Sequence, residues 1–429
     1  MKTVLLITYY FPPRWGIGSV RPSGLYKQLP EFGWDVLVLT PSIFGHTEVR
    51  PGVITTPYND VVGNWKKVFG YPRDTVLHKV WNISPSQLKK RSFPEKIIDF
   101  TLKSLWCLVA YPDAERGWYR YGVESARDLI NTRKIDAIIS TSSPPTTHLI
   151  AHRLKNEFNI PWIAEFRDLW TQNPYYPCGR FRKHFEARLE RKIIQPSDAL
   201  VSVSQHLVNK LTILHGNKTT GIIPNGFEPE LWIEKHPPLE EKLVMTHTGS
   251  LYDGKRNPEY LFKAIKILSN QGISFPDILE IKFLGPREDW LDDQIARYGI
   301  NNMVRQFGKV TRATSLSQQR KSQVLLLISG PDEKGGLPAK MYEYLAAQRP
   351  IVAIGGEHGK MDIGTILSET STGYYCTNLE ETITILDKLF REYKTEGKIS
   401  YLGKKVMVLK YSHIEMARKY ANLLSQITK

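Results

Sequence analysis

One segment of the sequence combines a glycine loop with a helix that carries two ionisable side chains. Gly335 and Gly336 lead into the helical pattern, and Pro338 lies where the first turn of a helix tolerates proline. Such a loop offers unpaired N–H groups and the positive end of the helix dipole to an anion. Lys340 and Glu343 are three residues apart and share one helix face. A cation for a diphosphate and a carboxylate for adjacent sugar hydroxyls together outline a nucleotide-sugar. An ordinary surface Lys–Glu pair explains the same pattern.

The segment 334–353 resembles the donor-site segment of the retaining, family 4 type glycosyltransferases of GT-B fold. In that family a Glu-x7-Glu motif ends in a helix that is followed by a Lys/Arg-Pro turn. Glu343 matches the second glutamate, which the resemblance assigns to the donor ribose. Gly335 stands at the position of the first glutamate, and Glu333, two residues away, is a substitute by position only. The sequence matches instead a Gly-Leu-Pro-x-Lys-x-Tyr-Glu-Tyr version of the motif, which adds Leu337 to the expected donor contacts.

Composition restricts the class of protein and its partners. With 429 residues, the chain is long enough for two or more domains. Its 41% hydrophobic and 24% charged residues are ordinary for a globular protein. The net charge of +15 indicates an anionic partner, namely anionic lipid, a phosphorylated small molecule or nucleic acid. Nucleic acid is the weakest of these candidates, because the sequence has no zinc-finger spacing, RNP-like motif or Arg-rich tail.

The cysteines and the N-terminus indicate a cytoplasmic protein. Cys107, Cys178 and Cys376 are odd in number and far apart, so we expect neither a disulfide framework nor a metal site, and a reducing compartment fits. The apolar run Val4–Ile7 is too short for a signal peptide and predicts a buried strand. No stretch approaches the ~20 apolar residues of a membrane span.

Each half of the sequence alternates apolar runs with helical patterns, which is typical of a parallel, doubly wound sheet. The predicted strands are Thr3–Thr8, Asp35–Leu39, Ala137–Thr141, Trp162–Phe166, Ala199–Val203, Leu243–Thr248, Glu280–Leu284, Val324–Ile328 and Ile351–Ile354. The predicted helices are Val20–Leu29, Thr147–Phe158, Pro258–Leu268, Thr314–Lys321 and Pro338–Ala347. The sequence therefore predicts an α/β protein of two Rossmann-like domains that face each other across a cleft.

Turn residues mark the domain boundary. Ile223 to Pro238 contains Pro, Asn-Gly and Pro-Pro, which are typical of linkers, so we expect domains over 1–228 and 238–410. A last helix is predicted to begin at Ser412, with a capping box formed by Glu415. The resemblance implies that 411–429 crosses back onto the first, acceptor-side domain, and that the second domain binds the nucleotide-sugar.

The first predicted strand is followed by a glycine loop that contains Gly16 and Gly18. Glycines let the backbone approach a ligand closely, but the third glycine of the dinucleotide fingerprint is missing, so redox dinucleotide binding is disfavoured. A tight turn is the alternative. In the resembled family this loop faces the cleft and touches the donor phosphate or the acceptor.

The first strand of the second half leads into Gly249, Ser250, Lys255 and Arg256. A glycine and two cations at the carboxyl edge of a parallel sheet make an anion site. Lys255 and Arg256 can neutralise a diphosphate leaving group, whose charge grows as the glycosidic bond breaks. A solvated basic turn is the alternative reading.

Lys309 and Val310 complete the expected donor site. With Gly308 they resemble the Gly-x-Val segment of the family, whose backbone meets the nucleobase. Backbone contacts leave little trace in side chains, so this assignment depends on the resemblance.

The acceptor side is expected at Arg167 and Asp168, which follow a predicted strand. Many relatives carry a histidine here, and a subgroup carries Phe-Arg-Asp-x-Trp, as this chain does. Asp168 can orient or deprotonate an acceptor hydroxyl, and Arg167 can pair with a phosphate. An internal Arg–Asp salt bridge is an equal alternative. His148 can reach the cleft, or it can be a satisfied histidine at a helix start.

Basic and aromatic residues alternate in the window 61–111, where nine Lys/Arg against three Asp/Glu leave a charge of +6. This composition favours a membrane surface that attracts anionic lipid, and a solvated loop with a buried Trp is the alternative. The residues expected to contact acceptor or membrane are Trp65, Lys66, Lys67, Lys89, Lys90, Arg91 and Trp106.

Taken with the resemblance, these residues predict a glycosyltransferase that moves a hexosyl or N-acetylhexosaminyl group from a UDP- or GDP-linked sugar to a glycan or lipid-linked acceptor, with retention. Asp168, Arg167, Arg256 and Lys340 are the expected catalytic residues. We expect no metal and no cofactor besides the nucleotide-sugar, no nucleic-acid partner, and a cytoplasmic location on the inner face of the cell membrane. A nucleotide-sugar epimerase and a non-catalytic nucleotide-sugar or lipid-binding module remain alternatives.

Overall fold

The computed structural model describes residues 1–14, 16–42, 50–61, 63–64, 105–173, 176, 178–330 and 337–429. Several residues singled out above lie outside this part of the chain: Trp65, Lys66, Lys67, Lys89, Lys90, Arg91, Glu333, Gly335 and Gly336.

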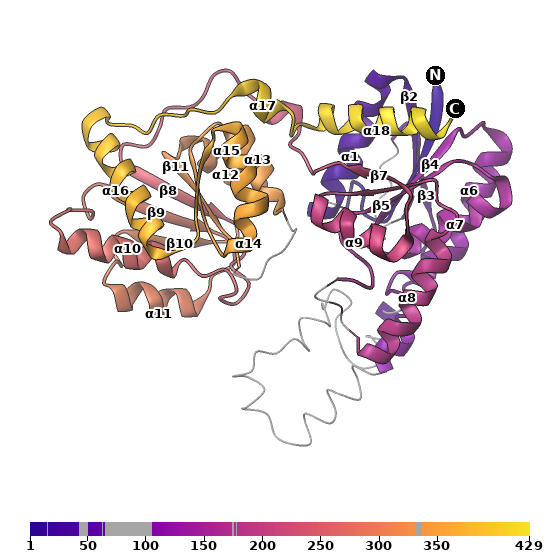
Figure 1. Cartoon of the computed structure of the whole chain (residues 1–429), viewed down its shortest axis with the longest axis horizontal. Coiled ribbons are helices and arrows are strands. Elements are labelled where there is room, and N and C mark those ends of the chain that lie inside the picture. The colour runs from indigo at the N-terminus through magenta and orange to yellow at the C-terminus, as the bar shows by residue number, and fades with distance from the viewer. Residues whose placement is uncertain are drawn as a thin grey trace. The chain divides into compact units, whose positions relative to one another are not determined.

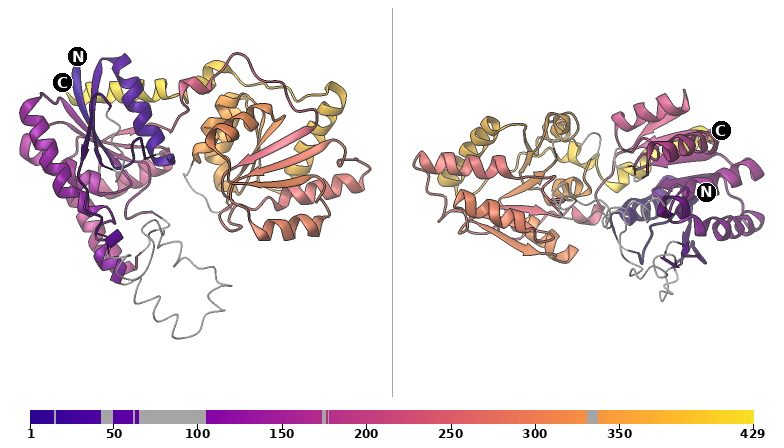
Figure 2. Two further views of the ribbon diagram at one scale, coloured as in Figure 1. Left: turned by 180° about the vertical axis from the view of Figure 1, so that it is seen from behind. Right: turned by 90° about the horizontal axis from the view of Figure 1, so that it is seen from below.

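The chain forms two compact units, each built on one parallel sheet (Figure 1). Unit 1 comprises Met1–Ile223 together with Ala417–Lys429, and unit 2 comprises Pro224–Met416. Helices cover both faces of each sheet (Figure 2), which confirms the predicted fold of two Rossmann-like halves. Among the described residues, no helix has the length and apolar character needed to cross a bilayer.

The sheet of unit 1 has the strand order β3-β2-β1-β4-β5-β6-β7. Its strands are β1 (Lys2–Thr8), β2 (Trp34–Pro41), β3 (Val53–Thr56), β4 (Ala137–Ser142), β5 (Trp162–Phe166), β6 (Ala199–Ser202) and β7 (Thr219–Ile222). The central strands are continuous apolar runs because both of their faces are buried. In the register of β1, Leu5 pairs with Leu37 on one side and with Ile138 on the other.

The helices of unit 1 are α1 (Ile17–Gln28), α6 (Tyr119–Thr132), α7 (Thr146–Phe158), α8 (Arg180–Ile194) and α9 (Gln205–His215), with 3-10 turns η1 (Leu29–Phe32) and η2 (Arg116–Trp118). The C-terminal helix α18 (His413–Ile427) begins in unit 2, and its residues from Ala417 onward belong to unit 1. The Oγ atom of Ser412 accepts the N–H of Glu415 at 3.3 Å, as the capping pattern predicts.

The sheet of unit 2 has the order β10-β9-β8-β11-β12-β13. Its strands are β8 (Leu243–Thr248), β9 (Leu279–Leu284), β10 (Val304–Gly308), β11 (Val324–Ile328), β12 (Ile351–Ile354) and β13 (Gly373–Cys376). Its helical elements are η3 (Pro229–Leu231), α10 (Glu259–Asn270), α11 (Asp289–Tyr298), α12 (Arg312–Lys321), α13 (Ala339–Ala347), α14 (Glu357–Gly359), the π-helical η4 (Lys360–Gly364), α15 (Thr365–Thr370), α16 (Leu379–Glu396) and α17 (Lys405–Leu409).

Cys107 and Cys178 form a disulfide, which corrects the expectation that the cysteines stay unpaired. The two residues are 71 positions apart, so their spacing gives no sign that the fold brings them together. The cysteine argument for a reducing compartment therefore does not hold. Cys376 is the unpaired, buried cysteine.

A buried ion pair joins three elements of unit 1. The Nε atom of Arg21 in α1 lies 2.5 Å from Oε1 of Glu165 in β5, and both side chains are almost fully buried. Tyr420 of α18 donates its hydroxyl to the same carboxylate oxygen and lies 3.2 Å from Nη2 of Arg21. Arg21 also donates to the carbonyl of Ile223, at the end of the unit's main segment. Burial works to raise the pKa of Glu165, but Arg21 and the hydrogen bonds to the carboxylate hold it below its usual value.

Replacing Arg21 with Ala should destabilise unit 1 by about 3–5 kcal/mol, because it leaves the buried carboxylate of Glu165 without its cation. Urea unfolding followed by tryptophan fluorescence measures the change. Arg120→Ala is the control, since it removes an exposed ion pair with Glu124 and should leave the unfolding midpoint unchanged. Equal midpoints for the two variants would show that the buried pair does not hold the unit together.

Candidate functional site

The candidate site in unit 2 begins at the carboxyl end of β8, where the strand order reverses between β8 and β11. Doubly wound sheets bind ligands at such a point, because the connections leave on opposite faces and open a crevice. Gly249 has a φ of 97°, a left-handed conformation that favours glycine. A side chain on Gly285, after β9, would lie 2.2 Å from the Gly249 carbonyl oxygen. The backbone is therefore tightly packed at this strand end.

Lys340 is held at this point by a buried histidine. The Nζ atom of Lys340 lies 3.1 Å from Nε2 of His247, and Nδ1 of His247 lies 3.1 Å from the Leu326 carbonyl of β11. The carbonyl can only accept, so Nδ1 carries the proton and Nε2 accepts from the ammonium. Burial, together with the charges of Lys340 and Arg256, lowers the pKa of His247 well below its usual value. A neutral His247 thus orients Lys340 without cancelling its charge.

A second contact fixes α13 against the sheet. The hydroxyl of Tyr344 accepts the N–H of Thr248 at 2.8 Å and donates to the Leu326 carbonyl at 3.2 Å. Tyr344 is fully buried, and burial raises its pKa, so the hydroxyl stays protonated. Through Tyr344, α13 is therefore bonded to the end of β8 and to the middle of β11.

The basic loop after β8 contributes a second cation. The guanidinium of Arg256 lies 4.6 Å from the centre of the Tyr252 ring, and its backbone N–H bonds to Leu251 at 3.0 Å. Ser250 accepts the N–H of Tyr252, which shapes the turn, whereas Lys255 is exposed. The charges of Lys340 and Arg256 both lower the pKa of His247. A side chain on Gly249, at the start of this loop, would lie 3.1 Å from Nζ of Lys340.

Glu343 of α13 is paired with an arginine that the sequence did not single out. Nε of Arg312, the first residue of α12, lies 3.1 Å from Oε1 of Glu343. Nη2 of Arg312 lies 2.9 Å from Oε2 of Glu228, which belongs to the first segment of unit 2. Arg312 therefore joins the helix of the predicted ribose ligand to that segment.

The remaining predicted donor contacts are the segment after β10 and Leu337. Lys309 and Val310 follow β10, which β9 separates from β8, and Lys309 is exposed. Leu337 is partly buried and packs against the hydrophobic cluster that contains Met341 and Leu345.

In unit 1, Arg167 joins the start of α1 to the end of β4. Its guanidinium donates to the carbonyls of Gly18, Ser142 and Ser143 at distances of 2.5 to 3.1 Å. A side chain on Gly18 would lie 2.9 Å from the ring of Tyr10, which explains the glycine there. Gly16, the N-cap of α1, is exposed and a side chain there would meet no atom. The glycine loop and Arg167 are thus brought together.

Asp168 is exposed beside Arg167. Within the described residues, its carboxylate makes no hydrogen bond or ion pair, and the charge of Asp168 acts on the pKa of Arg167 at longer range. The alternative of an internal Arg–Asp salt bridge is therefore not what holds this loop.

His148 reaches no part of the molecular surface, which contradicts its predicted contact with the acceptor. The residue is fully buried in α7, its Nδ1 lies 2.7 Å from Oγ of Ser140, and its ring is 4.7 Å from that of Phe166. Burial lowers its pKa to about 3, so it is a neutral core residue. Trp106 lies in the helical stretch 105–109 and is partly buried.

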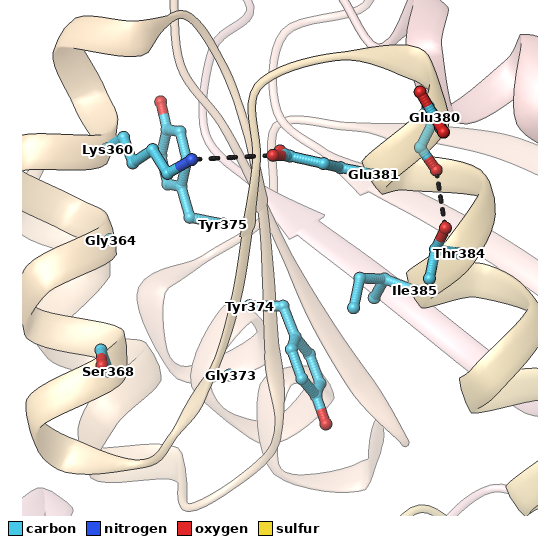
Figure 3. Close-up of a pocket in the computed structure, with 10 residues that line it drawn as sticks. All are labelled: Lys360, Gly364, Ser368, Gly373, Tyr374, Tyr375, Glu380, Glu381, Thr384 and Ile385. Atoms are coloured by element: carbon cyan, nitrogen blue, oxygen red, sulfur yellow. Dashed lines mark hydrogen bonds and ion pairs between the residues drawn. The ribbon is translucent and has the colours of Figure 1, made fainter.

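A separate pocket of about 510 Å³ lies at the β13 edge of the second sheet, between η4–α15 and α16 (Figure 3). Lys360 and Glu381 approach to 3.6 Å across it. Its other lining residues are Gly364, Ser368, Gly373, Tyr374, Tyr375, Glu380, Thr384 and Ile385. No predicted donor residue is among them, so this pocket is distinct from the site at β8. The described part of the chain holds no group of His, Cys, Asp and Glu suited to a metal ion.

Comparisons with known proteins agree with this geometry. Residues 18–226 match the family described as "Glycosyl transferase 4-like domain". Residues 18–226 therefore belong to the glycosyl transferase 4-like family. No curated protein matches the sequence significantly.

Solved structures share the fold over the whole length of this glycosyltransferase. Sucrose-phosphate synthase from Thermosynechococcus elongatus superposes with a TM-score of 0.62 at 14% identity, and the E. coli trehalose-6-phosphate structure with bound UDP-2-fluoro glucose gives the same two values. The lipopolysaccharide outer core galactosyltransferase WaaB gives 0.58 at 11% identity. In all three, 99% of each chain is covered.

Sequence reasoning missed the residues that position the charged side chains of the glycosyltransferase. His247 and Tyr344 lie inside motifs noted above, but burial and tautomer have no signature in the sequence. Arg312 and Glu228 are separated by 84 positions, and nothing in their spacing indicates that they meet.

We expect the imidazole of His247 to remain neutral, protonated at Nδ1, down to pH values well below the ordinary histidine pKa of about 6.5. Nitrogen-15 NMR of labelled histidine would show this tautomer directly. Lys340→Met should raise the pKa of His247 towards its usual value, because it removes a neighbouring positive charge. Lys398→Met, an exposed change in the same unit, is the control. A His247 signal that titrates near its usual pKa in the unaltered enzyme would contradict the assigned contact.

Proposed function

We propose that the enzyme transfers a hexosyl or N-acetylhexosaminyl group from a UDP- or GDP-linked sugar to a glycan or lipid-linked acceptor, with retention of configuration. The observation that carries the donor assignment is the contact of Lys340 with His247 and Gly249 at the switch point of the second sheet, at the start of the loop that carries Arg256. Two oriented cations at such a crevice suit a diphosphate.

In this proposal, Glu343 accepts hydrogen bonds from the ribose hydroxyls, while Gly249 and Ser250 let the diphosphate approach the backbone. The Glu343 side chain is 24% exposed, so its carboxylate is accessible although it is paired with Arg312. Arg312 contacts Oε1, and a carboxylate has about four acceptor positions, so room for the ribose remains.

The reaction breaks the bond between the sugar C1 and the diphosphate oxygen and forms a bond between C1 and an acceptor hydroxyl oxygen. The nucleoside diphosphate leaves with the bonding electron pair, and Lys340 and Arg256 stabilise the charge that develops on it. The acceptor hydroxyl gives up its proton to the departing diphosphate oxygen, so the transfer balances in charge. Asp168, exposed and without an ion pair in the described chain, is the group we assign to orient that hydroxyl.

The acceptor assignment is supported by the chain's charge of +15 and by the basic, aromatic window 61–111. Among the similar structures, one is a lipopolysaccharide galactosyltransferase. These observations favour an enzyme that works at the inner face of the cell membrane, where a lipid-linked acceptor would be held.

Replacing Glu343 with Ala should weaken binding of the nucleoside diphosphate by about 1–3 kcal/mol, the value of a charge-assisted hydrogen bond. Isothermal titration calorimetry with UDP and GDP measures the loss and identifies the preferred base. Glu380→Ala, in the pocket at β13, should leave the affinity unchanged. If Glu380 matters and Glu343 does not, the donor binds in that pocket and the assignment to β8 is wrong.

Replacing Lys340 or Arg256 with Ala should lower turnover about 100-fold, the usual loss for a group that stabilises a developing negative charge. The assay is release of nucleoside diphosphate from a panel of nucleotide-sugars, with the sugar product followed in parallel. Lys398→Ala controls for the loss of a cation elsewhere in unit 2.

Near-normal turnover in both variants would place the diphosphate elsewhere. Release of nucleotide with no glycosylated acceptor would indicate hydrolysis or epimerase chemistry. Binding of the donor without any turnover would indicate a non-catalytic module.

A further inference from the structure

Helix α8 carries an unusual surface, which we call the α8 face: the exposed residues Arg180, Phe181, Lys183, His184, Phe185, Arg188, Arg191 and Lys192. Helix α8, over Arg180–Ile194, contains two acidic residues, Glu186 and Glu190. Both are 1% exposed. The α8 face therefore consists of five cations, a histidine and two phenylalanines, without a single exposed carboxylate.

The two glutamates are turned inward by specific contacts. Glu186 accepts the indole N–H of Trp170 at 3.0 Å and an N–H of Arg182. Glu190 accepts the N–H of Thr171 at 3.0 Å. These bonds fix the rotation of the helix about its axis, so the opposite, cationic side is held outward.

The phenylalanines are exposed to an extent that a solvated helix does not require. The Phe181 side chain is 81% exposed and Phe185 is 45% exposed, and their ring centres are 5.0 Å apart. Spacings of four, three and four residues place Phe181, Phe185, Arg188 and Lys192 in one stripe along the helix. Apolar rings and cations thus share one side.

A neighbouring segment adds apolar surface. Leu108 is 73% exposed and follows Cys107, whose carbonyl accepts a hydrogen bond from Arg182 and whose sulfur is bonded to Cys178. The disulfide and this hydrogen bond attach the helical stretch 105–109 to the start of α8. Leu108 therefore lies close to the first turn of the helix that bears Phe181.

We propose that the α8 face docks on a bilayer that contains anionic lipid. Cations attract the headgroups, and exposed aromatic rings bury into the boundary between headgroups and acyl chains. A nucleic acid would explain the cations but not the exposed phenylalanines beside them, because rings that stack on bases are normally presented by a sheet or groove rather than a convex helix. The α8 face is a surface through which the membrane location proposed above would be reached, and its binding to lipid does not depend on the donor chemistry.

The test is sedimentation of the full chain with vesicles of phosphatidylcholine, with and without phosphatidylglycerol, in the absence of any sugar donor. The protein should pellet with the anionic vesicles. Phe181→Ser with Phe185→Ser should lower the partition coefficient about tenfold or more at every salt concentration, because this part of binding is apolar burial. Ile213→Ser, which removes an 83% exposed apolar side chain from α9, is the matched control.

Arg188→Gln with Lys192→Gln should weaken binding about fivefold for each cation at low salt and much less at high salt. Arg133→Gln with Lys134→Gln removes two exposed cations elsewhere in unit 1 and should have little effect. If the double change Phe181→Ser with Phe185→Ser disturbs folding, Phe181→Ser alone tests the surface, because the Phe181 side chain is largely exposed.

Partition of the α8 variants equal to that of the unaltered protein overturns the inference, whatever the enzyme's activity. Loss of oligonucleotide binding with normal vesicle binding in the same variants also overturns it, because the partner would then be a nucleic acid. If the unaltered protein transfers no sugar but the α8 variants lose vesicle binding, the α8 face is supported and only the proposed reaction is rejected.

Discussion

The need to neutralise a buried carboxylate organises the first unit of this glycosyltransferase. Glu165 lies in the middle of a parallel sheet, where an unpaired charge would cost several kcal/mol. Arg21 supplies the cation from α1 and Tyr420 supplies a hydroxyl from α18, so Oε1 of the carboxylate has both partners only when both helices are in place. The return of the C-terminal helix to the first unit is therefore tied to the sheet by chemistry as well as by apolar packing.

In the second unit, burial keeps an ionisable side chain neutral instead of enclosing a charge. His247 is fully buried, but its two nitrogens are each given a partner of fixed polarity, a carbonyl on one side and an ammonium on the other. The ring can satisfy both only when it is neutral, and so it behaves as a spacer that aims Lys340. One turn after Lys340 on α13, the hydroxyl of Tyr344 likewise accepts one hydrogen bond and donates another, to groups of β8 and β11. Lys340 is therefore carried by a helix that is fixed against the sheet.

The sequence was sufficient for the parts of the fold that local patterns determine. The runs Trp162–Phe166, Leu243–Thr248, Val324–Ile328 and Ile351–Ile354 are strands with the bounds predicted, because central parallel strands are continuous apolar segments. The outer strands β3, β7, β10 and β13 were missed. They are short and only partly buried, so their sequences lack that signal.

Only those parts of the candidate site that lie within short sequence motifs could be predicted. The segment from Leu337 to Glu343 and the loop after β8 were located by their residue types, but the contacts of Arg167 with three carbonyls and the burial of His148 depend on packing. The Cys107–Cys178 disulfide was missed for the same reason, since pairing between distant residues is a property of the fold.

Arg312 shows how such distant contacts bear on the proposed reaction. Its Nε bonds one carboxylate oxygen of Glu343 and its Nη2 bonds Glu228, so the guanidinium fixes the proposed ribose ligand in one orientation and ties it to the first residues of unit 2. All three side chains are partly exposed, and each bond is therefore weak by itself. A ribose that bonds the remaining acceptor positions of Glu343 would favour the same carboxylate orientation that Arg312 selects. Donor binding and the Arg312 bridge should then strengthen each other, because each reduces the freedom that the other must remove.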